Sequence, residues 1–300
     1  MLIYGVDYFT FHDVLEIMKH PKKAKLDKKS KQQIINSYQN VQKIVKSDKT
    51  VYGINTGFGP LCETKISEEE TAKLQENLII SHSVGVGKPI AKEISKIMMV
   101  SKIHALSKGF SGISLQVVER LILMVEKDII PVVPEQGSVG ASGDLAPLAH
   151  LVLPLLGLGK VWDGEQIVET SAVLQKHQLQ PLQLQAKEGL ALINGTQFIL
   201  AHAIKGLEKF EYLLNLADFA AAFSIEAYQG SASPFKKELH EIRPYKGSKL
   251  VAKRMLKLLK NSENLEYHEN CGRVQDPYSM RCVPQVHGAS RNAFEHLKEM

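Results

Sequence analysis

The stretch Gly137-Ser138-Val139-Gly140-Ala141-Ser142-Gly143-Asp144-Leu145 lies between Pro134 and a long apolar run, and the rest of the chain is organised around it. Its glycines permit positive φ angles and a close approach of backbone atoms. The centre of the stretch also permits one uncommon reaction. The amide nitrogen of Gly143 can attack the carbonyl carbon of Ala141, and loss of two water molecules, the second from Ser142, leaves an electrophilic methylidene-imidazolone.

Glycine-rich loops more often form turns or bind phosphate. The phosphate patterns fail here, because a Walker loop needs Lys and then Ser or Thr after its last glycine, where this chain has Asp144. The dinucleotide pattern G-x-G-x-x-G is absent, and a nucleophile elbow would need a final glycine in place of Asp144. Taken alone, the stretch therefore favours a plain turn, and other segments of the chain change that balance.

Five segments that are far apart in the chain resemble those of the aromatic amino acid ammonia-lyases. They are residues 52–59 (YGINTGFG), 81–87 (SHSVGVG), 137–150 (GSVGASGDLAPLAH), 188–197 (EGLALINGTQ) and 275–282 (QDPYSMRC). The segments follow the family order, and they are most similar to those of its histidine-specific members. The resemblance covers nearly the whole chain. Family members are considerably longer, so we expect this chain to correspond to the N-terminal part of one.

The resemblance implies an all-α fold, mainly a helical bundle of the ammonia-lyase type. Residues 1–185 would form an N-terminal helical region that carries the glycine loop, and residues 186–300 would begin a central bundle of long helices. The sequence pattern adds a small hairpin near residues 157–170, with an Asp163-Gly164 turn.

Helical periodicity dominates the chain. Ser67 and Glu70 form a capping box, which predicts a helix from there to about Ile80. A long helical pattern runs from Lys187 to about Gln229 and contains Gly195, which predicts a kink or close packing near Asn194. Residues 270–285 carry a glycine and two prolines and are predicted to be mostly loop.

Composition limits the class of protein. The net charge is +5, from 37 basic and 32 acidic residues, and much of the excess lies between Lys19 and Lys31. No aromatic residues interleave with these lysines, so a solvated segment is favoured over nucleic-acid binding. Three cysteines without a C-x-x-C spacing favour a reducing, cytoplasmic location and argue against a zinc site. The longest apolar run, residues 145–158, is too short and too broken to span a membrane.

The resemblance implies elimination of ammonia from an α-amino acid. In this family, Ala141-Ser142-Gly143 forms the 4-methylidene-imidazol-5-one group (MIO), so no external cofactor is expected. The electrophile captures the substrate's amino group. For a histidine-specific member, the products would be urocanate and ammonia, within histidine degradation to glutamate. Related enzymes are homotetramers in which the loop with Tyr278 and Arg281 comes from a neighbouring subunit.

The same resemblance assigns roles to single residues. Tyr52 would be the base that removes the β-proton, although as an isolated tyrosine at a turn it reads as a core aromatic. Asn194 would hydrogen-bond the amino group or the imidazolone oxygen, and its alternative is an Asn tolerated at a kink. Tyr278 and Gln275 would line the site, and their separate roles stay open.

Three further residues complete the predicted site. Arg281 would bind the substrate carboxylate, because a guanidinium offers two parallel hydrogen bonds to a carboxylate. His82 would favour an imidazole side chain, and Gln197 indicates the same preference. Asp144 would support the loop during cyclisation, with a helix N-cap as the rival interpretation.

Two alternatives remain open at this stage. The first keeps the chemistry and changes the substrate to tyrosine or phenylalanine, or makes the protein an aminomutase. The second is a catalytically incomplete helical assembly module, which would keep the fold without turnover. The presence of both Tyr52 and Ser142 argues against this second alternative.

Overall fold

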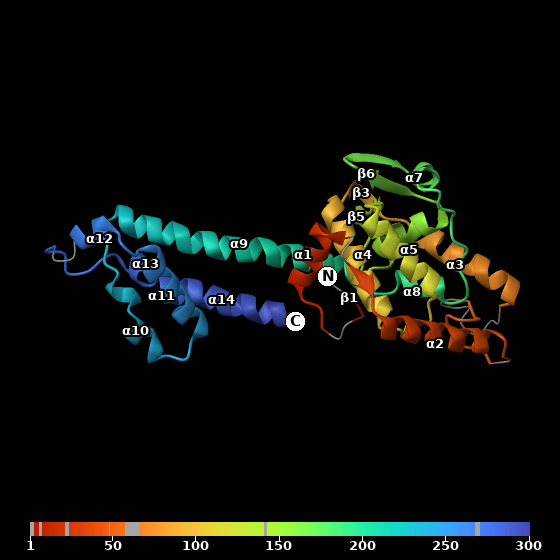
Figure 1. Ribbon diagram of the computed structural model, residues 1–300, viewed down its shortest axis with the longest axis horizontal. Coiled ribbons are helices and arrows are strands. Elements are labelled where there is room, and N and C mark those ends of the chain that lie inside the picture. The colour runs from red at the N-terminus through yellow and green to blue at the C-terminus, as the bar shows by residue number, and fades with distance from the viewer. Residues whose placement is uncertain are drawn as a thin grey trace. The chain divides into compact units, whose positions relative to one another are not determined.

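The computed structural model describes all residues except 1–2, 6–7, 22–23, 48, 58–65, 141–142 and 268–270. The chain forms two compact units, Met1–Ala203 and Ile204–Met300. Both consist mainly of helices, which confirms the predicted all-α fold (Figure 1). The functional division after residue 185 stays a prediction.

Helices and short strands alternate in the first unit. In chain order they are β1 (Ile3–Tyr4), α1 (Phe11–Lys19), β2 (Lys25–Leu26), α2 (Lys28–Val45), α3 (Glu68–His82), β3 (Val86–Pro89), α4 (Lys92–Ser107), α5 (Leu115–Glu126), β4 (Ile130–Pro131), β5 (Pro134–Gln136), α6 (Leu145–Val152), η3 (Leu153–Leu156), β6 (Lys160–Asp163), β7 (Gln166–Glu169), α7 (Thr170–Lys176) and α8 (Glu188–Ile193). Helix α9 (Gln197–Ala227) begins in this unit and continues into the second.

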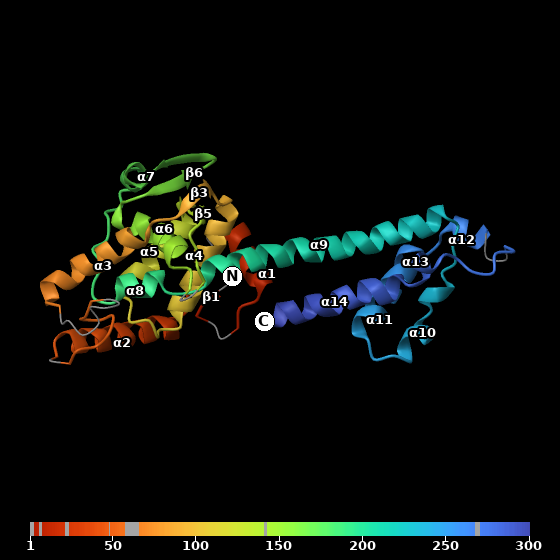
Figure 2. The ribbon, with the colours of Figure 1, turned by 180° about the vertical axis from the view of Figure 1, so that it is seen from behind.

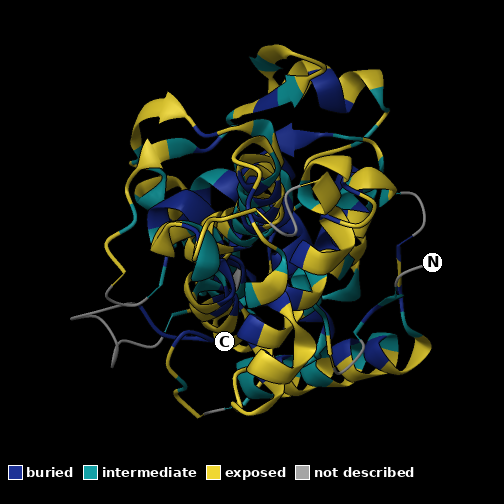
Figure 3. Cartoon of the chain, turned by 90° about the vertical axis from the view of Figure 1, so that its left-hand side faces the viewer, coloured by how far each residue is buried: buried dark blue, intermediate teal, exposed yellow. Residues whose placement is uncertain are grey.

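Helix α4 forms the centre of the first unit. Every residue from 97 to 103 is buried, so this helix is enclosed on all sides and not on one face alone. Helices α1, α2, α5 and α6 pack against it. Buried and exposed residues alternate along many helices of the chain, as in amphipathic helices (Figure 3).

Two local sequence signals in this unit are confirmed. Ser67 is the N-cap of α3, and its side chain accepts a hydrogen bond from the amide of Glu70. The predicted hairpin forms from β6 and β7, which pair antiparallel, and β4 extends it to three strands. Two more sheets have two strands each, β1 with β2 in parallel and β3 with β5 antiparallel.

The continuous helix predicted from Lys187 to Gln229 is wrong, because the chain leaves the helical conformation between α8 and α9. The close packing predicted near Asn194 as the alternative to a kink is present, at Gly195. Asn194 is extended, with φ −84° and ψ 125°. Gly195 has a φ of +146°, which side chains with a Cβ rarely adopt. The interruption places Asn194 and Gly195 at the start of α9 in an exposed turn.

The second unit consists of the rest of α9 and six further helical segments. These are η4 (Ser233–Phe235), α10 (Lys237–Glu241), α11 (Lys246–Leu258), α12 (Glu263–Tyr267), α13 (Tyr278–Arg281) and α14 (Val283–Glu299). The loop predicted over residues 270–285 is therefore shorter than expected. Pro284 lies in the first turn of α14, where proline is well tolerated because that turn needs no amide donor.

Close backbone packing and one buried carboxylate hold the second unit together. A Cβ on Gly247 of α11 would overlap the backbone of Gly288 in α14, so only glycine permits this approach. Helices α9 and α14 run side by side (Figure 2). Asp218 of α9 is fully buried. The Asp218 carboxylate accepts hydrogen bonds from Arg254, at 2.6 Å, from His287, at 2.9 Å, and from Arg291.

Candidate active site

The glycine loop meets the turn between α8 and α9 at Gly143. The residue has a φ of +98°. A Cβ added there would overlap the carbonyl of Gly195, so no side chain fits at this position. Ala141 and Ser142, the other two residues of the predicted imidazolone, lie outside the described residues. The structure thus brings the third residue of the triplet directly beside Asn194 and Gly195.

Asp144 fastens this contact from the next position along the chain. Its amide donates to the carbonyl of Gly195 at 2.7 Å. Its buried carboxylate accepts from the amides of Phe198, at 2.9 Å, and Ile199, at 3.1 Å, and from the hydroxyl of Ser138, at 2.6 Å. Three of these four hydrogen bonds join the loop to the start of α9 and the turn before it, and the bond from Ser138 lies within the loop.

The N-cap interpretation of Asp144 is correct in kind and wrong in its helix. Asp144 precedes α6, yet its side chain makes no capping bond to that helix. It caps α9, because Phe198 and Ile199 are the second and third residues of α9, whose amides an N-cap side chain normally satisfies. A carboxylate at this end of a helix is also favoured by the helix dipole.

Tyr52 lies in a turn that two buried polar side chains brace. The amide oxygen of Asn55 accepts from the Val51 amide, and its nitrogen donates to the Lys49 carbonyl, both at 2.8 Å. The Thr56 hydroxyl accepts from the amide of Gly53 at 3.2 Å. The Tyr52 side chain is 57% exposed, so the core-aromatic interpretation is wrong. The turn presents the phenol to solvent.

His82 is the last residue of α3 and is half-buried. Its Nδ1 lies 2.8 Å from the Leu78 carbonyl oxygen, which can only accept. Nδ1 therefore carries a proton, and in the neutral ring Nε2 is an acceptor. This contact fixes which nitrogen is offered to a ligand.

The segment after His82 is attached to the helix that follows the glycine loop. The amide of Gly85 donates to Nε2 of His150, in α6, at 3.0 Å. Burial lowers the pKa of His150, which keeps the ring neutral and Nε2 available as an acceptor. A Cβ on Gly137 would also press on the Gly85 backbone at 3.1 Å. The 81–87 and 137–150 segments thus share one anchored region.

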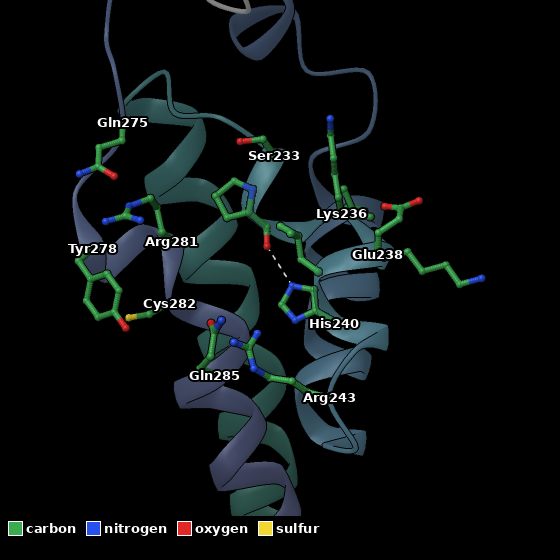
Figure 4. Close-up of a pocket in the computed structure, with 14 residues that line it drawn as sticks. Ser233, Lys236, Glu238, His240, Arg243, Gln275, Tyr278, Arg281, Cys282 and Gln285 are labelled. Atoms are coloured by element: carbon green, nitrogen blue, oxygen red, sulfur yellow. Dashed lines mark hydrogen bonds between the residues drawn. The ribbon is translucent and has the colours of Figure 1, made fainter.

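A second group of predicted residues lies in the second unit. Gln275, Tyr278 and Arg281 line a cavity of about 1180 Å³ whose facing wall includes His240 and Arg243 (Figure 4). The imidazole of His240 is held by the Pro234 carbonyl, at 2.9 Å, and by the Ser248 hydroxyl, at 3.0 Å.

Arg281 is half-buried and partly fixed in this cavity. Its Nε donates to the Asp276 carbonyl at 2.9 Å, and its guanidinium carbon lies 5.2 Å from the centre of the Tyr278 ring. The Nε bond and the aromatic contact orient the guanidinium plane. Its two terminal amino groups form the end that can meet a carboxylate with parallel hydrogen bonds.

The predicted site residues thus fall into two groups, each with its own unit. Gly143, Asp144 and Asn194 lie together in the first unit, where Tyr52 and His82 also lie. Gln275, Tyr278 and Arg281 lie together in the second. Among the described residues, no cluster of three or more His, Cys, Asp or Glu side chains could hold a metal ion.

Comparison with known proteins decides the family. The family model described as aromatic amino acid lyase matches residues 9–300. The chain belongs to the aromatic amino acid lyase family. Among curated relatives, a histidine ammonia-lyase of Yersinia enterocolitica is 47% identical over 97% of this chain. The chain spans 57–58% of the length of such relatives.

Solved structures of related lyases share the fold. A histidine ammonia-lyase from Trypanosoma cruzi is 36% identical, with a TM-score of 0.86 over 99% of this chain and 56% of its own. A tyrosine aminomutase from Streptomyces globisporus is 30% identical, with a TM-score of 0.88 over 98% of this chain and 59% of its own. In the part of the lyase chain that the structure describes, no helix is long and apolar enough to cross a membrane.

Several residues that shape this candidate site gave no sequence signal of function. Asn55 and Thr56 are buried braces beneath Tyr52, and His150 holds Gly85. All three belong to the quoted family segments, so membership of those segments was the only available indication. Lys102, which reaches the Asn194 carbonyl, lies outside them and could have been noticed as a lysine within an apolar helical run.

Proposed function

We propose that this chain acts as a histidine ammonia-lyase, eliminating ammonia from L-histidine to give urocanate. The observation that carries the proposal is the contact of Gly143 with the Asn194–Gly195 turn, which Asp144 stabilises with three hydrogen bonds to that turn and to the start of α9. The contact leaves no space for a side chain at Gly143. Membership of the aromatic amino acid lyase family and the curated histidine-specific relatives support the same activity.

The described residues fit an MIO group formed from Ala141-Ser142-Gly143. Gly143 supplies the amide nitrogen for ring closure, and its surroundings accept only glycine. The buried Oε1 of Gln197, next to Gly195, has no hydrogen-bond partner within the described residues, so a polar neighbour can be accommodated there. The group would supply an electrophile for the substrate's amino group, so no external cofactor is needed.

The other residues of the first unit would bind the substrate and move its protons. Tyr52 would accept the β-proton, a role that requires the exposed phenol which its braced turn provides. The Asn194 amide is exposed beside Gly143 and would hydrogen-bond the amino group or the ring oxygen. Asp144 would hold the loop in the conformation that ring closure requires.

His82 would select the imidazole side chain of the substrate. Because its Nδ1 donates to the Leu78 carbonyl, the neutral ring offers Nε2 as an acceptor for an imidazole N–H. A phenyl ring has no such donor and would leave Nε2 unpaired, which costs free energy in a buried site. The tautomer of His82 therefore supports histidine over phenylalanine or tyrosine as the substrate.

The second unit would supply carboxylate recognition and subunit contacts. Arg281 would bind the substrate carboxylate, with Gln275 and Tyr278 beside it. Tyr212, Leu216, Phe219 and Phe223 follow a helical spacing along α9 and are 45–68% exposed, which is typical of a helix that packs against another subunit. We therefore propose a homotetramer whose sites use residues from more than one subunit, located in the cytoplasm.

An intact mass and a substrate comparison test this proposal together. The native assembly should weigh two water molecules less per chain than its sequence, and it should convert L-histidine with a higher kcat/KM than L-tyrosine or L-phenylalanine. Ser142→Ala should restore the full sequence mass and abolish turnover, because alanine has no hydroxyl to lose.

Three results would contradict the proposal. A well-folded wild-type protein with the full sequence mass would exclude the MIO group. A higher kcat/KM for tyrosine, or formation of a β-amino acid, would assign the tyrosine lyase or aminomutase activity instead. A mass deficit without any turnover of the three amino acids would favour the helical assembly module.

Replacing Arg281 with lysine should weaken substrate binding strongly, although the exchange keeps the positive charge. Lysine cannot form two parallel hydrogen bonds with a carboxylate, and the loss of one charge-assisted bond costs roughly 1.5–3 kcal/mol, or about 10- to 150-fold in kcat/KM. Most of the change should appear in KM, because the carboxylate is held equally before and during the reaction.

Arg243→Lys provides the matched control, since Arg243 lines the same cavity and carries no predicted role in catalysis. Steady-state kinetics on L-histidine should leave this control within about twofold of the wild type. Equal effects of the two exchanges would move the carboxylate site away from Arg281.

A further inference from the structure

Lys102 occupies an unusual place for a lysine. It lies in the run of α4 from residue 97 to 103 that is buried on every side, and its own exposure is 2%. Lysine is almost never fully buried unless a carboxylate compensates its charge. Within the described residues, the structure gives Lys102 no carboxylate partner. Lys96, six residues earlier in the same helix, pairs with Asp128 at 2.8 Å in the usual way.

The partner of Lys102 is a main-chain carbonyl. Its Nζ donates to the carbonyl oxygen of Asn194 at 2.7 Å. Burial lowers the pKa of Lys102 to about 7, which means that a large fraction of the amine is neutral at neutral pH. A buried neutral amine needs a hydrogen-bond acceptor but no opposite charge, whereas a buried ammonium ion needs both. The carbonyl of Asn194 is such an acceptor.

The bond to Asn194 completes a set of anchors around α8. At the beginning of this short helix, Oε1 of the buried Gln75 accepts from the amides of Gly189, at 3.0 Å, and Leu190, at 3.3 Å. At its end, Lys102 holds the carbonyl of Asn194. Helix α8 is therefore fixed at both ends by side chains that come from α3 and α4.

Two successive carbonyls in the turn after α8 are thus held from different directions. The Asn194 carbonyl is bound by Lys102, and the Gly195 carbonyl is bound by the Asp144 amide at 2.7 Å. Fixing these two peptide planes fixes the backbone of Asn194 and Gly195, and the Asn194 side chain has few rotamers left to choose from on a fixed backbone. The side chain remains exposed while its carbonyl points into the core.

We propose that Lys102 is a positioning residue for the active site: its hydrogen bond to the Asn194 carbonyl sets the direction of the Asn194 side chain and the place of Gly195 against Gly143. The inference rests on the proposed function in one respect, because the consequence for turnover assumes that Asn194 contacts the substrate or the MIO group. The geometric part, that Lys102 orders the turn, does not depend on it.

A structural role and a positioning role predict opposite effects on stability. The folded state disfavours the charged amine, so this cost to stability is present at and below pH 7 and falls as the pH rises toward the value for an unfolded lysine, about 10.4. Lys102→Met keeps a side chain of similar length and removes that cost, which offsets the lost bond to Asn194. If Lys102 stabilises the fold, its replacement should lower the melting temperature. If Lys102 serves to position the turn, its replacement should not.

The experiment compares Lys102→Met with Lys96→Met, the same exchange in the same helix. We expect kcat for L-histidine, counted per chain that shows the mass deficit, to fall by about 10- to 100-fold in Lys102→Met, because small displacements of a positioning group are costly. KM should change much less. The melting temperature at pH 7 should be at least that of Lys96→Met, and amide hydrogen exchange in residues 194–199 should accelerate.

The outcomes separate this inference from the proposed function. A wild-type protein without a mass deficit or histidine turnover would overturn the function, and hydrogen exchange would still decide whether Lys102 orders the turn. Unchanged exchange in residues 194–199 would overturn the inference. So would a kcat within twofold of Lys96→Met, or a melting temperature of Lys102→Met more than about 5 °C below that of the control, which would make its role a structural one.

Discussion

Asp218→Ala should lower the free energy of unfolding by about 3–5 kcal/mol, because it leaves Arg254, His287 and the buried Arg291 around an empty position. Removing one member of a buried charge cluster costs more than the cluster contributes, since the remaining charges lose their carboxylate partner. Urea unfolding of the native assembly, followed by circular dichroism, measures the change. Glu208→Ala is the control, because Glu208 lies in the same helix and pairs only at the surface with Lys205, at 2.6 Å.

The control should change the free energy of unfolding by no more than about 1 kcal/mol, and equal losses in the two variants would mean that the cluster around Asp218 does not stabilise the fold.

The cluster around Asp218 also predicts that stability depends on pH. Burial by itself raises the pKa of Asp218, but the hydrogen bonds from His287, Arg254 and Arg291 outweigh it and hold the pKa below the usual value. The stabilisation is therefore complete above the unfolded value of about 3.9, and it is lost as the pH falls through the lower folded value.

Tyr52→Phe should produce a large loss of activity and leave the fold intact. General-base catalysis contributes roughly 10²–10⁴-fold, and phenylalanine has no group that can accept the β-proton. The side chain is 57% exposed, so the melting temperature should change little. The mass deficit should also persist, because Tyr52 is not part of the triplet that forms the ring. Steady-state kinetics on L-histidine, together with an intact mass, measures both effects.

Tyr8→Phe is the matched exchange for this test, since Tyr8 is 76% exposed and has no predicted role. It should retain the kcat of the wild type. If Tyr52→Phe retained it as well, the base would have to be another residue. If Tyr52→Phe lost the mass deficit, its role would lie in forming the electrophile and not in removing the proton.

Much of the fold could be predicted from the sequence because its signals are local. The N-cap at Ser67 and the Asp163-Gly164 turn depend on residues within a few positions of one another, and both are confirmed. The break at Gly195 was predicted only as a kink or a site of close packing, since periodicity continues on both sides of it. What decides the break is a φ of +146°, together with contacts to Gly143 and Asp144 from another part of the chain.

The candidate site was predicted from family segments, and the physical reasons for it are long-range. The helix that Asp144 caps begins more than fifty residues later, and no local pattern identifies it. The carbonyl that Lys102 holds is 92 positions away. From its neighbours in sequence, Asp144 is expected to cap the next helix, and Lys102 is expected to be a solvated lysine. Tertiary contacts give each of them a different role.

The bonds from Asp144 to Phe198 and Ile199 also set an order of events during synthesis. The loop at residues 137–144 is synthesised well before residue 199, so these bonds form only after the start of α9 has been made and has docked. The ring closure proposed for the triplet would then be a late maturation step that follows folding. The proposed electrophile would be completed only after the turn that Gly143 contacts is already in place.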